Sequence, residues 1–257
     1  MKMNKLVLAA TVALAASSVW AVNGTVKGDK GQWTGDISWQ PRSKSYKIEY
    51  KKGGSMVSAE CALANLDHLE IDKPAGFDKY VEMVRRGQGS SAIGYLTKIV
   101  SDYKMLDWDK PAGRWLVEAY LSAGNAQKAF EVASGIIRDD QKSAWSGELA
   151  PAYWQALLKL GKNVQLENCL RQAASTGDRA ASAEALVMRG DMIIANGDSA
   201  ATRRQALTDA YLRVALMYGD EPCKEARRSA MLKAAECFDK IGMAARAEAM
   251  RSHANTL

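Results

Sequence analysis

The sequence is poor in proline, phenylalanine and histidine. Its 257 residues include five Pro, three Phe and two His, while 47% are hydrophobic and 25% are charged. This composition is typical of a globular protein, and the length suits one large domain or two small ones. Few prolines and many alanines favour helix, because Ala loses no side-chain entropy when a helix forms. The net charge of +6 is weak evidence for a polyanionic partner.

The sequence also lacks the common motifs of catalysis and nucleotide binding. It has no Gly-x-Ser-x-Gly elbow, no Walker loop and no His-Glu-x-x-His pattern. Gly87-Gln-Gly89 resembles part of a nucleotide fingerprint, but it follows a predicted helix, so we interpret it as a hairpin turn. His68 and His253 have no Cys or carboxylate at metal-ligand spacing. We therefore expect a protein that is not an enzyme and has no cofactor and no metal site.

The first 21 residues predict a secretory signal peptide. Lys2 and Lys5 form a positive n-region, residues 6–16 are apolar, and residues 17–21 end in small residues suited to cleavage. The apolar run is too short for a permanent anchor, which needs about 20 apolar residues, and no later segment approaches that length. The first cysteine is Cys61, so no lipid-bearing Cys follows the cleavage site. We expect an exported protein of bacterial type, periplasmic or secreted, that is soluble after signal peptide cleavage.

Four cysteines permit disulfides in an exported chain. Cys61, Cys169, Cys223 and Cys237 match no zinc-binding spacing. Cys223 and Cys237 lie about 20 Å apart if one helix holds both, which is too far for a disulfide. The first pair to test is Cys169–Cys223. The alternative is that the cysteines are small buried residues on helix faces.

Residues 22–73 predict a small β-rich module. Tyr46, Ile48 and Tyr50 alternate with charged residues, which is the period of a half-buried strand. A Lys-Lys-Gly-Gly turn follows, and its glycines supply the positive φ that a hairpin needs. Further strand candidates are residues 32–39, 56–59 and 66–72. We expect four or five short strands in a small barrel or meander.

Residues 74–257 predict a mainly α-helical solenoid of about five hairpins. A glycine recurs where a first helix is expected to end, at spacings of 37, 37, 36 and 45 residues. These glycines are Gly87, Gly124, Gly161, Gly197 and Gly242. The residue four positions earlier is always large and apolar: Met83, Tyr120, Leu157, Ile193 and Phe238. Positions 5, 9 and 12 after the glycine are mostly small or apolar and trace one face of a second helix.

These repeats resemble the tetratricopeptide (TPR) family. The best match runs from Trp115 to Ala129, and a second runs from Ala234 to Ala247. The resemblance covers about residues 75–257 and implies stacked helical hairpins. The segment from Tyr211 to Pro222, with the Ala-rich hairpin after it, also resembles exported TPR proteins of bacterial cell envelopes. In that family the role is protein docking.

Three features depart from the TPR pattern. The periods exceed the family's length of about 34 residues. Leu166 replaces the small residue of the third hairpin. The fourth hairpin has an insertion near residues 199–204, and residues 202–218 predict a long second helix. We therefore expect degenerate repeats.

Stacked hairpins leave a groove lined by their first helices. The candidate groove residues are Arg85, Arg114, Glu118, Gln155, Lys159 and Arg189; the alternative for each one singly is ordinary surface charge. We expect a non-catalytic interaction scaffold or adaptor of the bacterial periplasm or cell envelope, whose groove binds a protein partner as a peptide or helix. Two alternatives stay open. One is a self-assembling structural envelope subunit, and the other is an envelope hydrolase with a site between the two modules.

A basic patch is a second candidate surface. Its residues are Arg42, Lys44, Lys47, Lys51 and Lys52. Nearby aromatics suggest single-strand nucleic-acid binding. The alternation instead places Tyr46 and Tyr50 opposite Lys47 and Lys51, so that the aromatics are core and the lysines form a solvated face or a protected edge. Because export also argues against nucleic acid, we expect no nucleic-acid partner.

Overall fold

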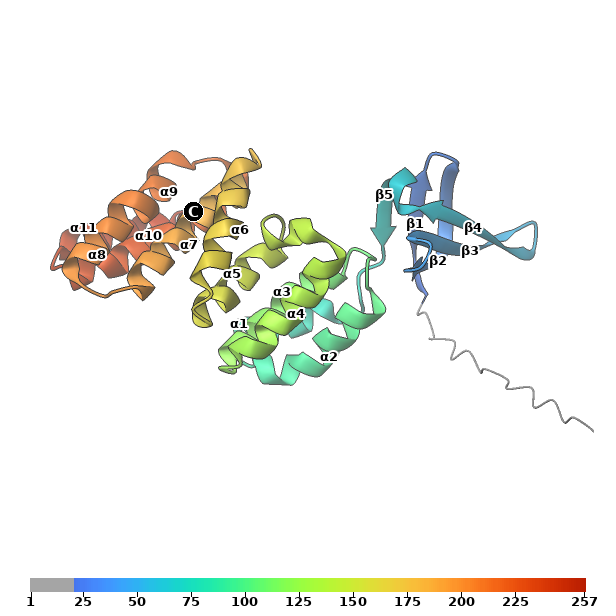
Figure 1. The fold of residues 1–257 in the computed structure, drawn as a ribbon, viewed down its shortest axis with the longest axis horizontal. Coiled ribbons are helices and arrows are strands. Elements are labelled where there is room, and N and C mark those ends of the chain that lie inside the picture. The colour runs from blue at the N-terminus through green and yellow to red at the C-terminus, as the bar shows by residue number, and fades with distance from the viewer. Residues whose placement is uncertain (1–20) are drawn as a thin grey trace, which may run out of the picture. The chain divides into compact units, whose positions relative to one another are not determined.

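The protein divides into two compact units, which separate between Asp72 and Lys73. The computed structural model describes residues 21–257. The predicted signal peptide therefore lies outside the described residues, apart from its last position. Figure 1 shows strands in the first unit and helices in the second. No helix in the described part of the chain has an apolar stretch of the length that a bilayer crossing requires.

The first unit is an open five-stranded antiparallel sheet. Its strands are β1 (Val22–Gly28), β2 (Gly31–Gln40), β3 (Ser45–Lys52), β4 (Ser55–Ala62) and β5 (Leu66–Ile71). Their order in the sheet is β4-β3-β2-β1-β5. A barrel closes only when its two edge strands pair, and here β4 and β5 lie at opposite edges. The barrel alternative is therefore wrong, and the meander describes β1 to β4.

Alternation along β3 sets which side of the sheet is buried. Tyr46 is 2% exposed and Ile48 is fully buried, whereas Lys47 and Lys51 are exposed. This confirms the predicted period of two. Across the sheet the same buried face carries Val26, Ile37 and Cys61. The turn between β3 and β4 has two adjacent glycines with φ of 59° and 84°, the type I′ geometry that follows the twist of a hairpin.

The second unit consists of five helical hairpins. The first helices are α1 (Phe77–Arg85), α3 (Asp109–Ser122), α5 (Leu149–Lys159), α7 (Arg179–Ala195) and α10 (Lys224–Lys240). The second helices are α2 (Gly89–Asp102), α4 (Ala126–Asp139), α6 (Asn163–Ser175), the pair α8 (Ala200–Ala206) and α9 (Leu212–Met217), and α11 (Ala244–Asn255). Each first helix contacts the next, α1 with α3, α3 with α5, α5 with α7 and α7 with α10. The predicted array of five hairpins is confirmed.

Four of the five recurring glycines end their helix in the same way. Gly87, Gly124, Gly161 and Gly242 have φ between 65° and 78°, the left-handed region. At Gly124 the N–H donates to the Leu121 carbonyl at 3.0 Å, and the next N–H donates to the Tyr120 carbonyl at 2.8 Å. These two bonds define a Schellman motif, which satisfies carbonyls at the helix end. The other three sites repeat both bonds.

Gly197 differs from the other four glycines. Its φ lies outside the left-handed region. Of the two Schellman bonds it makes only the one that spans three residues, from its N–H to the Ile194 carbonyl at 3.1 Å. The chain instead continues to Ser199, whose side chain and Thr202 form a reciprocal capping box for α8. The insertion of the fourth hairpin therefore replaces the glycine turn with a separately capped helix start.

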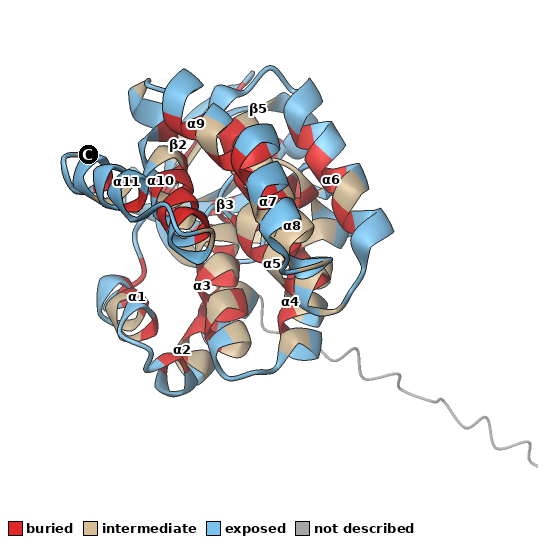
Figure 2. Cartoon of the chain, turned by 90° about the vertical axis from the view of Figure 1, so that its left-hand side faces the viewer, coloured by how far each residue is buried: buried red, intermediate tan, exposed pale blue. Residues whose placement is uncertain are grey.

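The second helices bury the face that the glycine ladder predicts. The residues five positions after each of the four left-handed glycines, Ala92, Ala129, Leu166 and Ala247, are all fully buried. Leu166 occupies the same interior position as the alanines. Figure 2 shows buried and exposed residues alternating along α6 and α7, as expected for helices buried on one face.

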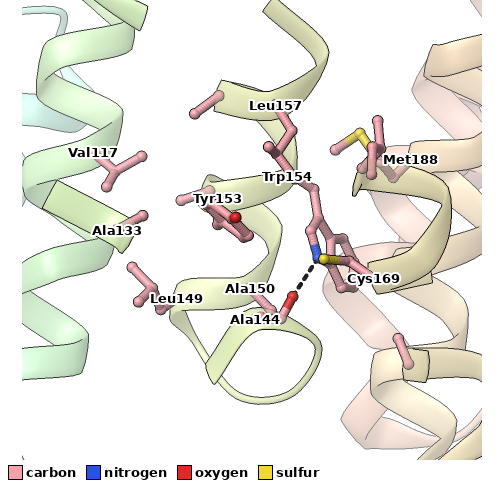
Figure 3. Close-up of a cluster of buried hydrophobic side chains, with 14 of the residues drawn as sticks. Val117, Ala133, Ala144, Leu149, Ala150, Tyr153, Trp154, Leu157, Cys169 and Met188 are labelled. Atoms are coloured by element: carbon pink, nitrogen blue, oxygen red, sulfur yellow. Dashed lines mark hydrogen bonds between the residues drawn. The ribbon is translucent and has the colours of Figure 1, made fainter. Parts of the chain in front are cut away.

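The central hairpin holds the largest fully buried side chain of the described residues. Trp154 is 1% exposed, and its indole N–H donates to the Ala144 carbonyl at 2.8 Å. Figure 3 shows Trp154 beside Cys169, with Tyr153 and Leu149 directed to the other side of α5. The hydrogen bond fixes the loop before α5 to the helix core, because a buried indole N–H needs an acceptor.

The predicted Cys169–Cys223 disulfide is not formed. The four cysteines are free and buried. Cys169 packs in the cluster around Trp154, whereas Cys223 belongs to the cluster around α10 and donates from Sγ to Asp220 Oδ2 at 3.3 Å. The alternative interpretation, small buried residues within the fold, describes them. Burial raises the pKa of the Cys169 thiol to about 11, which keeps it protonated.

Candidate functional site

The first helices carry a set of polar residues on one side, which we call the first-helix face. Its members are the polar residues ten, six or two positions before a glycine of the ladder; the same spacing also reaches the buried Phe77, Val81 and Val187. An α-helix turns about 100° per residue, so positions four apart lie on one side. In the second to fifth hairpins its members include Arg114, Glu118, Gln155, Lys159, Asp191 and Glu236. All six belong to α3, α5, α7 or α10.

Three predicted groove residues meet around Trp115. The guanidinium carbons of Arg85 and Arg114 each lie 4.9 Å from the centre of its ring. Arg114 Nε also donates to Glu118 Oε1 at 3.1 Å. Stacking on an aromatic face and pairing with a carboxylate both order a long side chain. This end of the first-helix face is therefore a preorganised cationic surface.

Gln155 and Lys159 line a cavity of about 470 Å³ between α5, α7 and α10. Its centre is Asp191, which sequence reasoning missed. Lys233 Nζ lies 2.8 Å from Asp191 Oδ1, and Gln155 Nε2 donates to Asp191 Oδ2 at 3.3 Å. The Tyr211 hydroxyl donates to Asp191 Oδ1 at 2.8 Å. One carboxylate therefore joins three first helices and the second helix of the fourth hairpin.

Tyr211 reaches Asp191 from a π-helical turn. The predicted long second helix of the fourth hairpin is α8, a π-helical turn at residues 207–211, and α9. A π turn adds a residue and rotates the side chains that follow. The Tyr211 ring packs against Gly190, where an added Cβ would lie 2.4 Å from Tyr211 Cε1. Burial and the Asp191 charge raise the pKa of the Tyr211 hydroxyl, so it remains a donor.

Two charges on this cavity have no ion pair within residues 21–257. Lys233 is neutralised by Asp191, and Arg203 by Asp198. Lys159 and Glu236, which also line the cavity, have no such counter-ion. The cavity therefore offers one cation and one anion to a ligand with polar groups of both signs.

A second cavity of about 280 Å³ lies along the first-helix face, lined by α3, α5 and α7 and the loop before α5. It contains Arg114, Trp145 and Glu184. Burial raises the pKa of Glu184, and the nearby positive charge of Arg114 partly opposes that rise. Both cavities are thus bordered by consecutive first helices, the larger one also by Arg203 and Tyr211 and the smaller one by the loop before α5.

Arg189 does not join this surface. Its Nη2 lies 2.7 Å from Glu167 Oε1 on the second helix α6. Arg189 stands eight positions before Gly197, about 200° around the helix from positions six and ten. The glycine spacing therefore excludes Arg189 from the first-helix face and includes Asp191. The sequence alone could have identified Asp191 in this way.

The predicted basic patch is spread over two places: Lys47 and Lys51 lie on the exposed face of β3, whereas Arg42 and Lys44 lie in the turn before β3 and Lys52 ends the strand. Its five residues, Arg42, Lys44, Lys47, Lys51 and Lys52, are all exposed. Lys47 pairs with Glu49 at 2.6 Å. Tyr46 is buried against Trp39, with ring centroids 5.0 Å apart. Because Tyr46 is buried in the core, it cannot serve on the exposed face as a stacking platform for the bases of a single-stranded nucleic acid.

Neither histidine is among the residues that line the two cavities. His68 Nε2 is 3.9 Å from Glu70 Oε2 on β5, and these side chains are 62% and 76% exposed. His253 is exposed on α11. Within residues 21–257 no group of three or more His, Cys, Asp or Glu side chains is arranged to hold a metal ion.

Comparison with known proteins gives a structural similarity of limited extent. No family model and no curated protein sequence matches the chain. The chain is similar to a crystal structure of TPR-like repeats of a kinesin light chain from Podosopora anserina, at 15% identity and a TM-score of 0.42. The match covers 72% of this chain and 96% of that one, and a single-substitution variant of the same protein gives the same values with 95% coverage. The description of the hairpins rests on their own geometry.

Proposed function

We propose that this protein is a non-catalytic interaction scaffold of the bacterial periplasm or cell envelope. Its ligand is a segment of another protein, bound along the first-helix face. The observation that carries the proposal is the pair of cavities bordered by consecutive first helices, about 470 and 280 Å³. A row of cavities along one face suits a peptide or helix that places successive side chains in them.

The chemistry of the face suits a ligand with both apolar and polar anchors. Arg85 and Arg114 are held on Trp115, and Asp191 is held by three partners, so little ordering is needed on binding. Preorganised groups bind more tightly because their entropy is lost on folding rather than on association. The unpaired Lys159 favours a ligand with a carboxylate at the larger cavity.

The binding test uses Lys159→Glu, with Arg171→Glu as matched control. Arg171 is exposed on the second helix α6, away from the first-helix face, and receives the same charge change. The unmodified chain is used for affinity capture from a cell-envelope extract of the producing organism, and candidate partners are identified by mass spectrometry. Binding of each purified partner is then measured by calorimetry. Lys159→Glu is expected to weaken binding at least tenfold, whereas Arg171→Glu leaves it unchanged.

An equal affinity of both variants for every purified partner would reject the first-helix face as the binding surface. Export is tested separately by fractionating the producing cells and measuring the intact mass of the protein. A periplasmic or secreted form lacking residues 1–21 supports the proposed location. A full-length form in the cytoplasm contradicts it.

A further inference from the structure

The edge strand β4 lacks most features that keep sheet edges from pairing. It has eight residues, no Pro and one charged side chain, Glu60. Its register with β3 runs without interruption along its whole length. The other edge, β5, is shorter, carries Asp67, His68 and Glu70, and has a register shift against β1. Charges, short length and irregularity protect β5, and β4 lacks this protection.

The hairpin turn decides which backbone groups of β4 face outward. Lys52 and Ser55 close a two-residue turn, and such a closing pair is hydrogen-bonded. At the other end the N–H of Leu63 donates to the Lys44 carbonyl at 2.9 Å. In both pairs the residue on the β4 side, Ser55 or Leu63, is odd-numbered. In an antiparallel pair these bonds alternate, so the odd-numbered residues of β4 bond to β3.

The even-numbered residues Met56, Ser58 and Glu60 therefore direct their N–H and C=O groups away from β3. Their side chains lie on the exposed face of the sheet, and Met56 is 58% exposed. An additional antiparallel strand would satisfy these backbone groups.

A second copy of β4 can pair with this edge around a two-fold axis. An antiparallel pair around a two-fold axis keeps each residue on the same face, so an even residue must meet an even residue. Centring the axis on Ser58 places Ser58 opposite itself and Met56 opposite Glu60 of the second copy. Centring it on Glu60 places two carboxylates opposite each other, which is unfavourable.

The Ser58-centred register also covers apolar surface. Val57 and Ala59 lie on the core face of β4 but are only half-buried there, because β4 is the last strand. In this register Val57 meets Ala59 of the second copy, twice by symmetry. Cross-strand apolar pairs of this kind stabilise a sheet.

We propose that two copies of this protein associate through β4, centred on Ser58, to form a continuous ten-stranded sheet. The occupant of the edge is a second copy because the Ser58-centred register sets Val57 against Ala59 twice and places no like charges opposite each other. This association uses the β unit alone and is independent of ligand binding on the first-helix face.

The first test measures mass against concentration by analytical ultracentrifugation of the purified full chain. We expect a reversible dimer. Ser58→Lys places two ammonium groups opposite each other and is expected to raise the dimer dissociation constant about fivefold or more, and Ser58→Asp does the same with carboxylates. An equimolar mixture of the two variants is expected to recover dimer, since the mixed pair is complementary. Asp67→Lys on the β5 edge is the control and is expected to leave the dissociation constant unchanged.

The second test fixes the register. Directly opposite residues in a hydrogen-bonded antiparallel pair have Cα atoms about 5.5 Å apart, within disulfide range. Ser58→Cys is therefore expected to cross-link as a dimer under mild oxidation. Met56→Cys is expected to stay monomeric on a non-reducing gel, because its symmetry mate lies four residues further along.

Either of two results would overturn the proposal. One is a protein that stays monomeric at every concentration up to about 1 mM, because a dissociation constant above that value is too weak for specific association. The other is a dimer that Ser58→Lys and Ser58→Asp leave unchanged, which would place the contact elsewhere. Circular dichroism of each variant shows that the change lies in association rather than in folding.

Discussion

The glycine ladder allows a test of backbone strain in which the protein supplies its own control. Gly124 has φ of 75°, and a Cβ there would meet nothing within 4 Å. Gly197 ends the corresponding helix of the fourth hairpin outside the left-handed region, and its Cβ would make one ordinary contact, 3.7 Å from Thr202. Replacing each with alanine therefore isolates the effect of φ, because neither change creates a clash.

Two effects set the expected magnitudes. Alanine in the left-handed conformation costs about 1–2 kcal/mol. Replacing glycine also reduces the entropy of the unfolded chain, which stabilises the protein by about 0.4–1 kcal/mol. Gly124→Ala is therefore expected to lower the free energy of unfolding by about 1 kcal/mol. Gly197→Ala is expected to raise it by about 0.5 kcal/mol, because only the entropy effect operates there.

The assay is urea unfolding followed by far-UV circular dichroism, with the denaturant slope compared between variants. A constant slope shows that both changes act on stability rather than on cooperativity, which is a concern in repeat arrays. Gly124→Asn is expected to fall between glycine and alanine, since Asn tolerates positive φ. Equal effects of Gly124→Ala and Gly197→Ala, in sign and size, would refute the assignment of φ as the cause.

Three further outcomes follow from the fourth hairpin. Asp191→Ala removes the shared acceptor of a partly buried network and is expected to cost about 1–3 kcal/mol in urea unfolding, while Asp191→Asn costs less because it keeps an acceptor; no loss with either would show that the network contributes nothing. Gly190→Ala forces a Cβ onto the Tyr211 ring and is expected to lower the unfolding free energy by about 1–3 kcal/mol, with a change in near-UV circular dichroism as the second readout. The hydrogen-bonded Arg179 holds the pKa of Asp220 at about 2; because this folded-state pKa lies below the unfolded value of 3.8, the stabilisation is present above pH 4 and is lost as the pH falls toward 2. Asp220→Asn should flatten the stability profile in that acid range, and an unchanged acid slope would contradict the coupling.

The sequence by itself determined most of the elements and their order, although it gave no separate signal for β1 or for the π-helical turn in the fourth hairpin. Alternation around Tyr46 fixed β3, because a period of two has one buried face only in an extended strand. The glycine spacing indicated the five hairpins, since a left-handed helix end favours glycine and four of the five helices end in this way. The spacing together with residue polarity also pointed to the first-helix face: Asp191 fits it but was overlooked, and Arg189 does not fit it.

Only the tertiary structure decided which distant groups meet. The edges of the sheet stay open because strand pairing depends on curvature and register, which alternation does not encode. Cys169 and Cys223 pack in separate clusters, and their spacing in the chain could not show this. The network of Asp191 with Tyr211 and Lys233 required a π-helical turn and the stacking of three hairpins. Local sequence sets the geometry of each helix end, but the partners of a buried side chain depend on how whole elements pack.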